Sequence, residues 1–129
     1  MDGKGSLITQ VYTSKAQLPI KDAVVIVTTP QEENPTILFI RTTNSSGKTT
    51  AVELDSPPMA NSLTPDNGTE AFSSYYVRIY HPEFEPTLVK DVQIFSNQIT
   101  IQPVDMIPLE ESRKPADKTD VIVITPQNL

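Results

Sequence analysis

LPIKDAVV (residues 18–25) and TTNSSGKT (residues 42–49) are the two stretches that indicate the fold of this chain. The first leads into an apolar run rich in β-branched residues, and the second carries the Asn, Ser and Gly that favour tight turns. Gly47 is expected to supply a positive φ angle in a hairpin between two strands. Together the two stretches predict the front half of a small antiparallel β-sandwich, and neither has a pattern typical of a catalytic site.

Apolar and polar residues alternate along most of the chain, which is the period of a half-buried β-strand. The strands expected from this pattern cover residues 7–12, 23–29, 37–42, 50–54, 75–79, 87–95 and 99–106. Residues 37–42 (ILFIRT) are apolar enough to predict a strand at the centre of a sheet. Pro103 predicts a bulge or an edge position in the last strand, because proline cannot donate to a sheet ladder. The predicted fold class is therefore all-β, a seven-stranded antiparallel Greek-key sandwich.

One face of these strands is predicted to form a core between two sheets. The side chains expected to point inward are Leu7, Val11, Val25, Val27, Thr50, Val52, Leu54, Tyr75, Val77, Ile79, Val104 and Met106.

The composition excludes several classes of function. The 129 residues include no Cys, which rules out disulfides, thiolate zinc sites and cysteine nucleophiles. A net charge of −6 leaves no basic stripe for nucleic acid. No run approaches the roughly 20 apolar residues that span a bilayer, and the first residues lack the apolar core of a signal peptide. The sequence thus predicts a soluble, cytoplasmic protein with no membrane insertion.

The chain divides into a sandwich over residues 1–109 and a C-terminal extension over residues 110–129. The extension begins as a charged linker and contains an uncharged, β-prone patch: Val121, Ile122, Val123 and Ile124. An exposed patch of this kind is an aggregation hazard, so it is predicted to pair with an edge of its own sandwich or with a partner. Residues 56–72 form a long polar loop, which in a compact domain is usually functional or mobile.

Tyr76, Arg78 and Tyr80 are the leading candidates for a binding site. They alternate with the expected core residues and therefore share the outer face of one strand. Tyrosine interleaved with arginine is typical of binding hot spots, although ordinary cross-strand packing gives the same pattern. Asp66 and Asn67 in the long loop complete the predicted partner-binding set.

No metal, cofactor or catalytic residue is predicted. His81 is the only histidine and is expected at a strand end, hydrogen-bonded to the backbone. Asp55, Asp66, Asn67 and Glu70 offer oxygen ligands of the kind that calcium prefers, but their spacing fits no EF-hand loop, and loop solvation explains them better.

The strand pattern, the LPI stretch before Ala23, the Ser-Ser-Gly turn and the run from Tyr75 to Phe84 resemble a known family. They are similar to the carboxypeptidase-regulatory-like domain of the transthyretin-like (prealbumin-like) superfamily, over about residues 5–109. VQIF (residues 92–95) and IQPVDMIPL (residues 101–109) resemble modules that accompany clostridial peptidoglycan-binding and spore-cortex proteins.

This resemblance implies a non-catalytic accessory or protein-interaction module in bacterial spore or cell-envelope assembly. The hydroxyisourate hydrolases of the superfamily depend on His and Arg residues and a Tyr-Arg-Gly-Ser-type C-terminus. This chain has one His and ends TPQNL, which argues against that hydrolase activity, and the chain is predicted not to be an enzyme. Two other functions stay open: a carbohydrate- or peptidoglycan-binding module acting through the face of Tyr76 and Tyr80 and the loop at residues 56–72, and a purely structural spacer.

Overall fold

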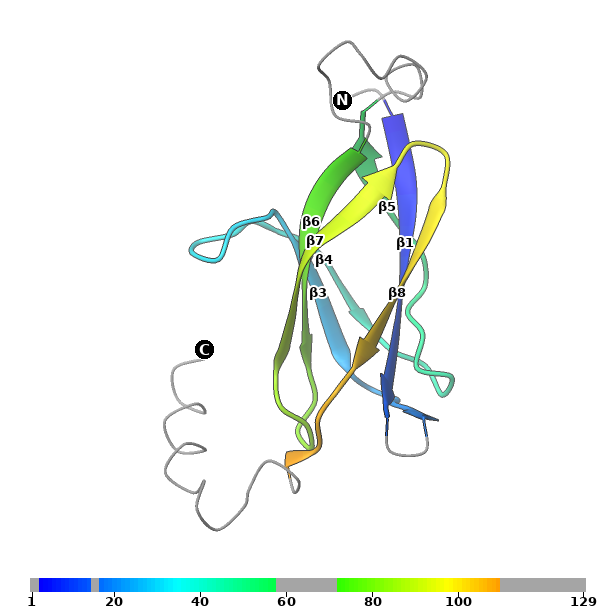
Figure 1. The fold of residues 1–129 in the computed structure, drawn as a ribbon, viewed down its shortest axis with the longest axis vertical. Coiled ribbons are helices and arrows are strands. Elements are labelled where there is room, and N and C mark those ends of the chain that lie inside the picture. The colour runs from blue at the N-terminus through cyan, green and yellow to red at the C-terminus, as the bar shows by residue number, and fades with distance from the viewer. Residues whose placement is uncertain (1–2, 15–16, 58–71, 110–129) are drawn as a thin grey trace.

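The structure is a computed structural model that describes residues 3–14, 17–57 and 72–109. These residues form two β-sheets packed face to face, which confirms the predicted β-sandwich (Figure 1). The eight strands among them are β1 (Gly3–Thr13), β2 (Leu18–Pro19), β3 (Val24–Thr28), β4 (Ile37–Thr42), β5 (Val52–Ser56), β6 (Phe72–Tyr80), β7 (Thr87–Phe95) and β8 (Ile99–Asp105). The prediction of seven strands omitted β2, because two residues are too few to show alternation.

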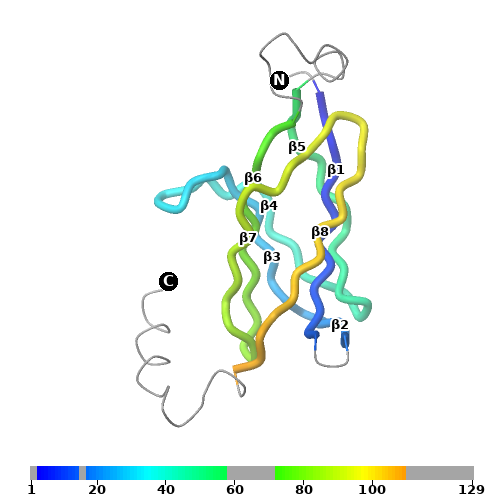
Figure 2. Tube along the Cα trace, in the orientation of Figure 1, coloured from blue at the N-terminus to red at the C-terminus, as the bar shows by residue number. Residues whose placement is uncertain are grey.

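The first sheet, here called the β6 sheet, has the order β4-β3-β6-β7, and its neighbouring strands are antiparallel. The second, the β1 sheet, is built on the long strand β1. Strands β5 and β2 pair antiparallel with the two ends of β1, and β8 pairs with it in parallel along the opposite side (Figure 2). The expectation of a purely antiparallel sandwich is therefore wrong for the β1–β8 pair. The chain turns at Asn97, which has a φ of 61°, and crosses from β7 into the other sheet in the direction of β1.

The core lies between the sheets and consists of the residues that alternation placed there. All the predicted inward residues are buried except Thr50, which is exposed and precedes β5. The core also takes in side chains from β7 and from the segment after β2: Ile20, Ala23, Val92 and Ile94. No cysteine or metal is needed to account for this core, because one continuous apolar cluster joins both sheets.

Strand β4 is at the edge of the β6 sheet, so its predicted central position is wrong. Phe39 packs against the core, whereas Ile37 and Ile40 are 56% and 54% exposed. A continuous apolar run favours a strand buried on both faces. Here the run instead leaves apolar side chains in solvent on an edge strand. The prediction for Pro103 is confirmed, since β8 is an edge strand that pairs only with β1 among the described strands.

The turn at residues 44–47 is present, and Gly47 has the expected positive φ, 76°. The Asn44 side-chain oxygen accepts hydrogen bonds from the backbone N–H groups of Ser46 and Lys48, at 2.9 and 3.0 Å. However, β4 and β5 belong to different sheets, so the turn is part of a crossing between sheets and not of a hairpin.

Two predictions concern residues outside the described ranges. One is the binding role of Asp66 and Asn67, and the other is strand pairing by the patch Val121, Ile122, Val123 and Ile124. Within the described ranges, the structure contains no helix of the length and apolar character needed to cross a membrane.

Candidate functional site

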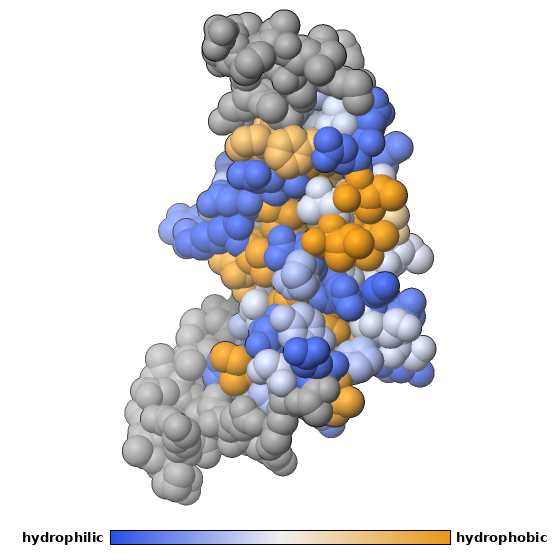
Figure 3. Space-filling view, turned by 45° about the vertical axis from the view of Figure 1, so that its right-hand side comes forward, coloured by the Kyte–Doolittle hydropathy of each residue, from blue (hydrophilic) through white to orange (hydrophobic). Residues whose placement is uncertain are grey.

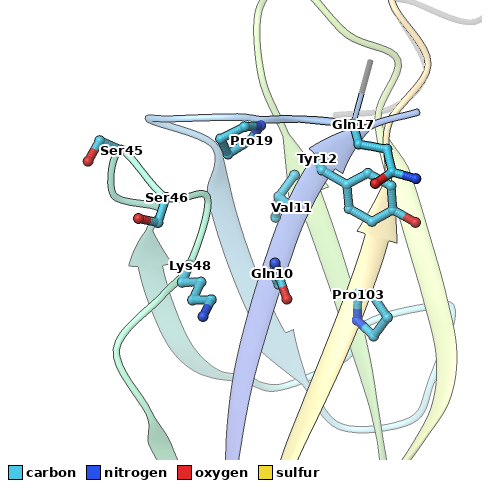
Figure 4. A pocket seen from close by; sticks show the side chains of 9 residues that line it. All are labelled: Gln10, Val11, Tyr12, Gln17, Pro19, Ser45, Ser46, Lys48 and Pro103. Atoms are coloured by element: carbon cyan, nitrogen blue, oxygen red, sulfur yellow. The ribbon is translucent and has the colours of Figure 1, made fainter. Parts of the chain in front are cut away.

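An open groove of about 520 Å³ lies on the outer face of the β1 sheet (Figure 4). Its volume falls within the range of roughly 300–1,000 Å³ that is usual for ligand sites. The groove is lined by Gln10, Val11, Tyr12, Gln17, Pro19, Ser45, Ser46, Lys48 and Pro103.

Strand β1 forms the floor of the groove. Because side chains alternate along a strand, Gln10 and Tyr12 face outward while Val11 between them is buried in the core. Pro103 is beside Gln10 in the parallel register of β8, and Pro19 is opposite Tyr12 in the short pair with β2. Two proline rings and a tyrosine ring thus bring three rigid side chains to the groove.

The turn at residues 44–48 forms one wall, and backbone hydrogen bonds fix it to β1. The carbonyl oxygen of Gly47 accepts a bond of 2.7 Å from the N–H of Val11, and the N–H of Thr49 donates to the carbonyl of Thr9 at 3.0 Å. A β-bridge between Gln10 and Lys48 continues this contact. The polar side chains of the turn therefore project from a wall that is anchored to the sheet, which limits the ordering cost of binding.

The described lining of the groove offers many hydrogen-bonding groups and one charge. Its two glutamine amides each carry donors and acceptors, its two serine hydroxyls do both, and the Tyr12 hydroxyl adds a further group. Lys48 is the charged residue of the lining, and the described lining residues include no His, Asp or Glu. Figure 4 shows Ser45, Ser46 and Lys48 on one side of Gln10, and Tyr12 and Pro103 on the other.

Tyr76, Arg78 and Tyr80 lie together on the opposite side of the molecule, on the outer face of the β6 sheet. Their alternation with Tyr75, Val77 and Ile79 is as predicted. Arg78 donates hydrogen bonds to the Thr28 hydroxyl at 2.5 Å and to the Gln31 carbonyl at 3.0 Å, and its guanidinium is 5.9 Å from the centre of the Tyr76 ring. Much of the hydrogen-bonding capacity of Arg78 is thus used within the fold.

Apolar side chains extend this face across the sheet. Ile40, Ile26, Arg78 and Leu88 are successive cross-strand neighbours from β4 to β7. Arg78 and Tyr80 also line a hollow of about 180 Å³ together with Pro86, Thr87 and Leu88. The structure therefore brings three of the five predicted site residues onto one face, whereas Asp66 and Asn67 are outside the described ranges.

An ion pair borders this face. Lys90 donates to Glu32 at 2.5 Å, and this hydrogen bond lowers the pKa of the Glu32 carboxyl and raises the pKa of the Lys90 ammonium. Both side chains are well exposed, so the pair contributes little to stability.

His81 and Asp55 have structural partners. The Nδ1 of His81 accepts a hydrogen bond from the backbone N–H of Glu83 at 3.1 Å, which confirms the predicted backbone-bonded histidine. The Asp55 carboxylate pairs with Lys4 at 2.6 Å, and this hydrogen bond lowers the pKa of the carboxyl. Within the described residues, no three His, Cys, Asp or Glu side chains are grouped as metal ligands.

The sequence alone does not predict this groove. Gln10 and Tyr12 could be assigned to the outward face of the first strand, but nothing local indicates that Lys48 and Pro103 lie beside them. Those neighbours result from the sheet crossing after β4 and from the parallel pairing of β8. The outward Tyr12 is the one local signal that could have pointed to this site.

The comparisons with known proteins concern the fold alone. No protein-family model matches the chain, and no curated protein matches it. Over 83% of its length the chain resembles part of the Bacillus anthracis TIE protein, with a TM-score of 0.52 and 16% identity, and it covers 17% of that chain. This likeness supports the β-sandwich fold.

Two further structures align less well. One is described as a putative carbohydrate binding protein from Bacteroides uniformis ATCC 8492, with a TM-score of 0.49, 16% identity, 80% of this chain covered and 41% of that chain. The other is chlorocatechol 1,2-dioxygenase from Pseudomonas putida, with a TM-score of 0.41, 13% identity and coverage of 82% and 59%. The chain thus spans less than two thirds of each of these three proteins.

Proposed function

We propose that this chain is a non-catalytic binding module that recognises a carbohydrate chain in the groove of the β1 sheet. The observation that carries the proposal is the combination of the Tyr12 ring with amide and hydroxyl groups in one open groove. Sugars present apolar C–H faces that pack on aromatic rings, and hydroxyls that need both donors and acceptors. An open groove can accommodate part of a longer sugar chain.

The absence of catalysis is part of the proposal. Glycoside hydrolysis generally requires two carboxyl groups, and nucleophilic catalysis requires an activated nucleophile beside a base. The described lining residues supply neither, since they include no Asp, Glu or His. The serines at positions 45 and 46 have no base among those lining residues.

Matched tyrosine variants test this proposal on a glycan array. Tyr12 and Tyr80 are both half-buried tyrosines on outer sheet faces, but on opposite sheets. Tyr12→Ala is expected to lose about five- to a hundredfold in affinity for any glycan that the wild-type chain retains, on the scale of the roughly 1–3 kcal/mol that an aromatic ring contributes when a nucleobase stacks on it. Tyr80→Ala is expected to bind normally. The opposite result would place the site on the β6 sheet, and no glycan binding by the folded wild-type chain would refute the proposal.

A second candidate is protein interaction, which the exposed apolar row on the β6 sheet favours. Strand β4 has no further strand beside it among the described residues, and Ile37 and Ile40 are exposed along it. Its one charged residue, Arg41, lies with its guanidinium 5.1 Å from the centre of the Phe39 ring. The occupant that fits this edge is an uncharged, extended segment of a partner protein that adds as a strand. Ile40→Lys should abolish capture of such a partner without loss of the fold, and unchanged capture would exclude this edge.

The transthyretin-like resemblance suggests a biological role for this binding module. We propose that the module belongs to the carboxypeptidase-regulatory-like group and serves in spore or cell-envelope assembly, where peptidoglycan is the available glycan. The support is the resemblance of residues 92–95 and 101–109 together with the two-sheet fold. Labelling of the protein in sporulating cells would test it, and a diffuse distribution would contradict it.

A further inference from the structure

We propose that the saccharide bound in the groove carries a carboxylate, and that Lys48 recognises this group. The inference rests on the proposed carbohydrate-binding function and specifies its ligand class as an acidic oligosaccharide. It follows from where the one charged residue of the described groove lining is held and from what surrounds it.

The backbone position of Lys48 is fixed on both sides. Its N–H donates to the Asn44 side chain at 3.0 Å, and its carbonyl oxygen accepts from the Asn44 N–H at 2.9 Å. The bridge to Gln10 then sets the residue beside the groove floor. The backbone of Lys48 is therefore held in place, and its ammonium group can move only as far as the lysine side chain reaches.

Within the residues that the structure describes, the charge of Lys48 has no acidic partner. The side chain is exposed, and none of the described carboxylates forms an ion pair with it. Two described lysines do form ion pairs: Lys4 pairs with Asp55 on the neighbouring strand, and Lys90 pairs with Glu32 between β3 and β4. Lys48 instead faces a groove whose described lining contains no acid, so an anionic group on a ligand is the partner that this site lacks.

The polar neighbours of Lys48 fit the same group. Ser45 and Ser46 come from the same turn, and their exposed hydroxyls can donate to a carboxylate. At the other end, Asp105 is in register with Tyr12, but its carboxylate accepts a bond of 2.8 Å from the Ser14 N–H and does not line the groove. Among the described lining residues, the positive charge is therefore at the turn.

The two ends therefore select different parts of one ligand. Gln10 lies between Lys48 and Tyr12 in Figure 4, so a sugar that packs on the tyrosine ring is not the unit that reaches the ammonium group. We infer a ligand of at least two sugar units, with the acid on the unit nearer the turn. Because Lys48 is exposed, the acid should increase affinity only about two- to fivefold, and less at high salt.

Matched ligand pairs test the proposal with the full-length chain. The probes are trigalacturonic acid and N-acetylglucosaminyl-N-acetylmuramic acid, each compared with its methyl ester, which keeps the sugar and removes the charge. Titration calorimetry at low salt should show the acid of at least one pair binding about two- to fivefold more tightly than its ester. Lys48→Met should reduce that ratio to about one, and Lys48→Arg should restore it. Lys21→Met, which removes the same charge from an exposed residue outside the groove lining, should keep the wild-type ratio.

The outcomes separate this inference from the function on which it rests. Equal binding of acid and ester by the wild-type chain would overturn the role of Lys48 while leaving carbohydrate recognition in place. A preference that survives in Lys48→Met would do the same. Failure of the wild-type chain to bind every acid, every ester and every glycan of the array would overturn both proposals.

Discussion

The hydroxyl of Tyr75 donates a hydrogen bond of 2.6 Å to the backbone carbonyl of Asp55. Tyr75 belongs to β6 and Asp55 to β5, so this bond crosses the core and joins the two sheets. The tyrosine ring is buried, 8% exposed, and the bond satisfies its one polar group. A residue that sequence patterning identifies only as core thus also fixes the position of one sheet over the other.

Tyr75→Phe is expected to destabilise the fold by about 1 kcal/mol, because it deletes a hydrogen bond and leaves the ring in place. Urea denaturation would measure this. Tyr76→Phe, on the solvent-facing side of the same strand, is the matched control and should have little effect. Equal effects would mean that the bond to Asp55 contributes nothing to stability.

The same bond predicts how stability depends on alkaline pH. Burial, and secondarily the charge of Asp55, raise the pKa of the Tyr75 phenol above its ordinary value of 10.0. Its contribution is therefore complete below about pH 10 and decreases as the pH rises from that value toward the folded-state pKa, because the unfolded chain ionises first. The free energy of unfolding of the wild type minus that of Tyr75→Phe, measured between pH 8 and 11, should show this decrease. A flat difference would contradict it.

Leu54→Ala should cost on the order of 2–4 kcal/mol, since the side chain is 3% exposed and its removal leaves a cavity between the sheets. Leu88→Ala makes the same chemical change on the outer face, where the side chain is 40% exposed. It should cost under about 1 kcal/mol. Thermal or urea unfolding of the pair would confirm which side of each strand faces the core.

Gly47→Ala is expected to destabilise the fold far more than Lys48→Ala. A Cβ atom at Gly47 would lie 2.3 Å from the carbonyl oxygen of Val11, and the φ of 76° adds about 1–2 kcal/mol of strain for a side chain. The groove wall should move as well, so the variant should also lose glycan binding. Similar, small effects of both substitutions on stability would mean that the turn is not held against β1 as described.

Chelation by EDTA should leave both the melting temperature and glycan binding unchanged. Asp55, the described member of the acidic set considered for calcium, has its carboxylate paired with Lys4. A clear fall in melting temperature with EDTA, reversed by added calcium, would show that a cation contributes to the fold.

The core could be predicted from sequence because alternation is a local signal. Leu7, Val52 and Val77 each follow the period of two and are each buried. Thr50 was misplaced since the regular strand starts two residues later, at Val52. Strand β4 was misplaced for a different reason. The local sequence shows how apolar a strand is. The position of that strand in the sheet depends on pairing with residues far away in the sequence.

Of the two candidate sites, one could be predicted from local sequence and the other could not. The shared face of Tyr76 and Tyr80 could be predicted because both lie on one strand. The groove could not, because Tyr12, Lys48 and Pro103 come from three separate segments that only the fold brings together. The parallel β1–β8 register that places Pro103 there has no signature in either strand alone.

The parallel pairing of the first and last described strands also decides how the sandwich responds to mechanical force. The start of β1 and the end of β8 lie at opposite ends of the sheet (Figure 1). Tension that pulls Gly3 away from Asp105 therefore acts along both strands and loads seven residue pairs, from Ser6 with Ile99 to Tyr12 with Asp105, in shear. A hairpin pulled at its open end would separate one pair at a time. The β1 sheet would instead rupture collectively. The same two strands carry Ile8, which is paired with Ile101, and the exposed Ile99. Apolar side chains also gather on the molecular surface in Figure 3.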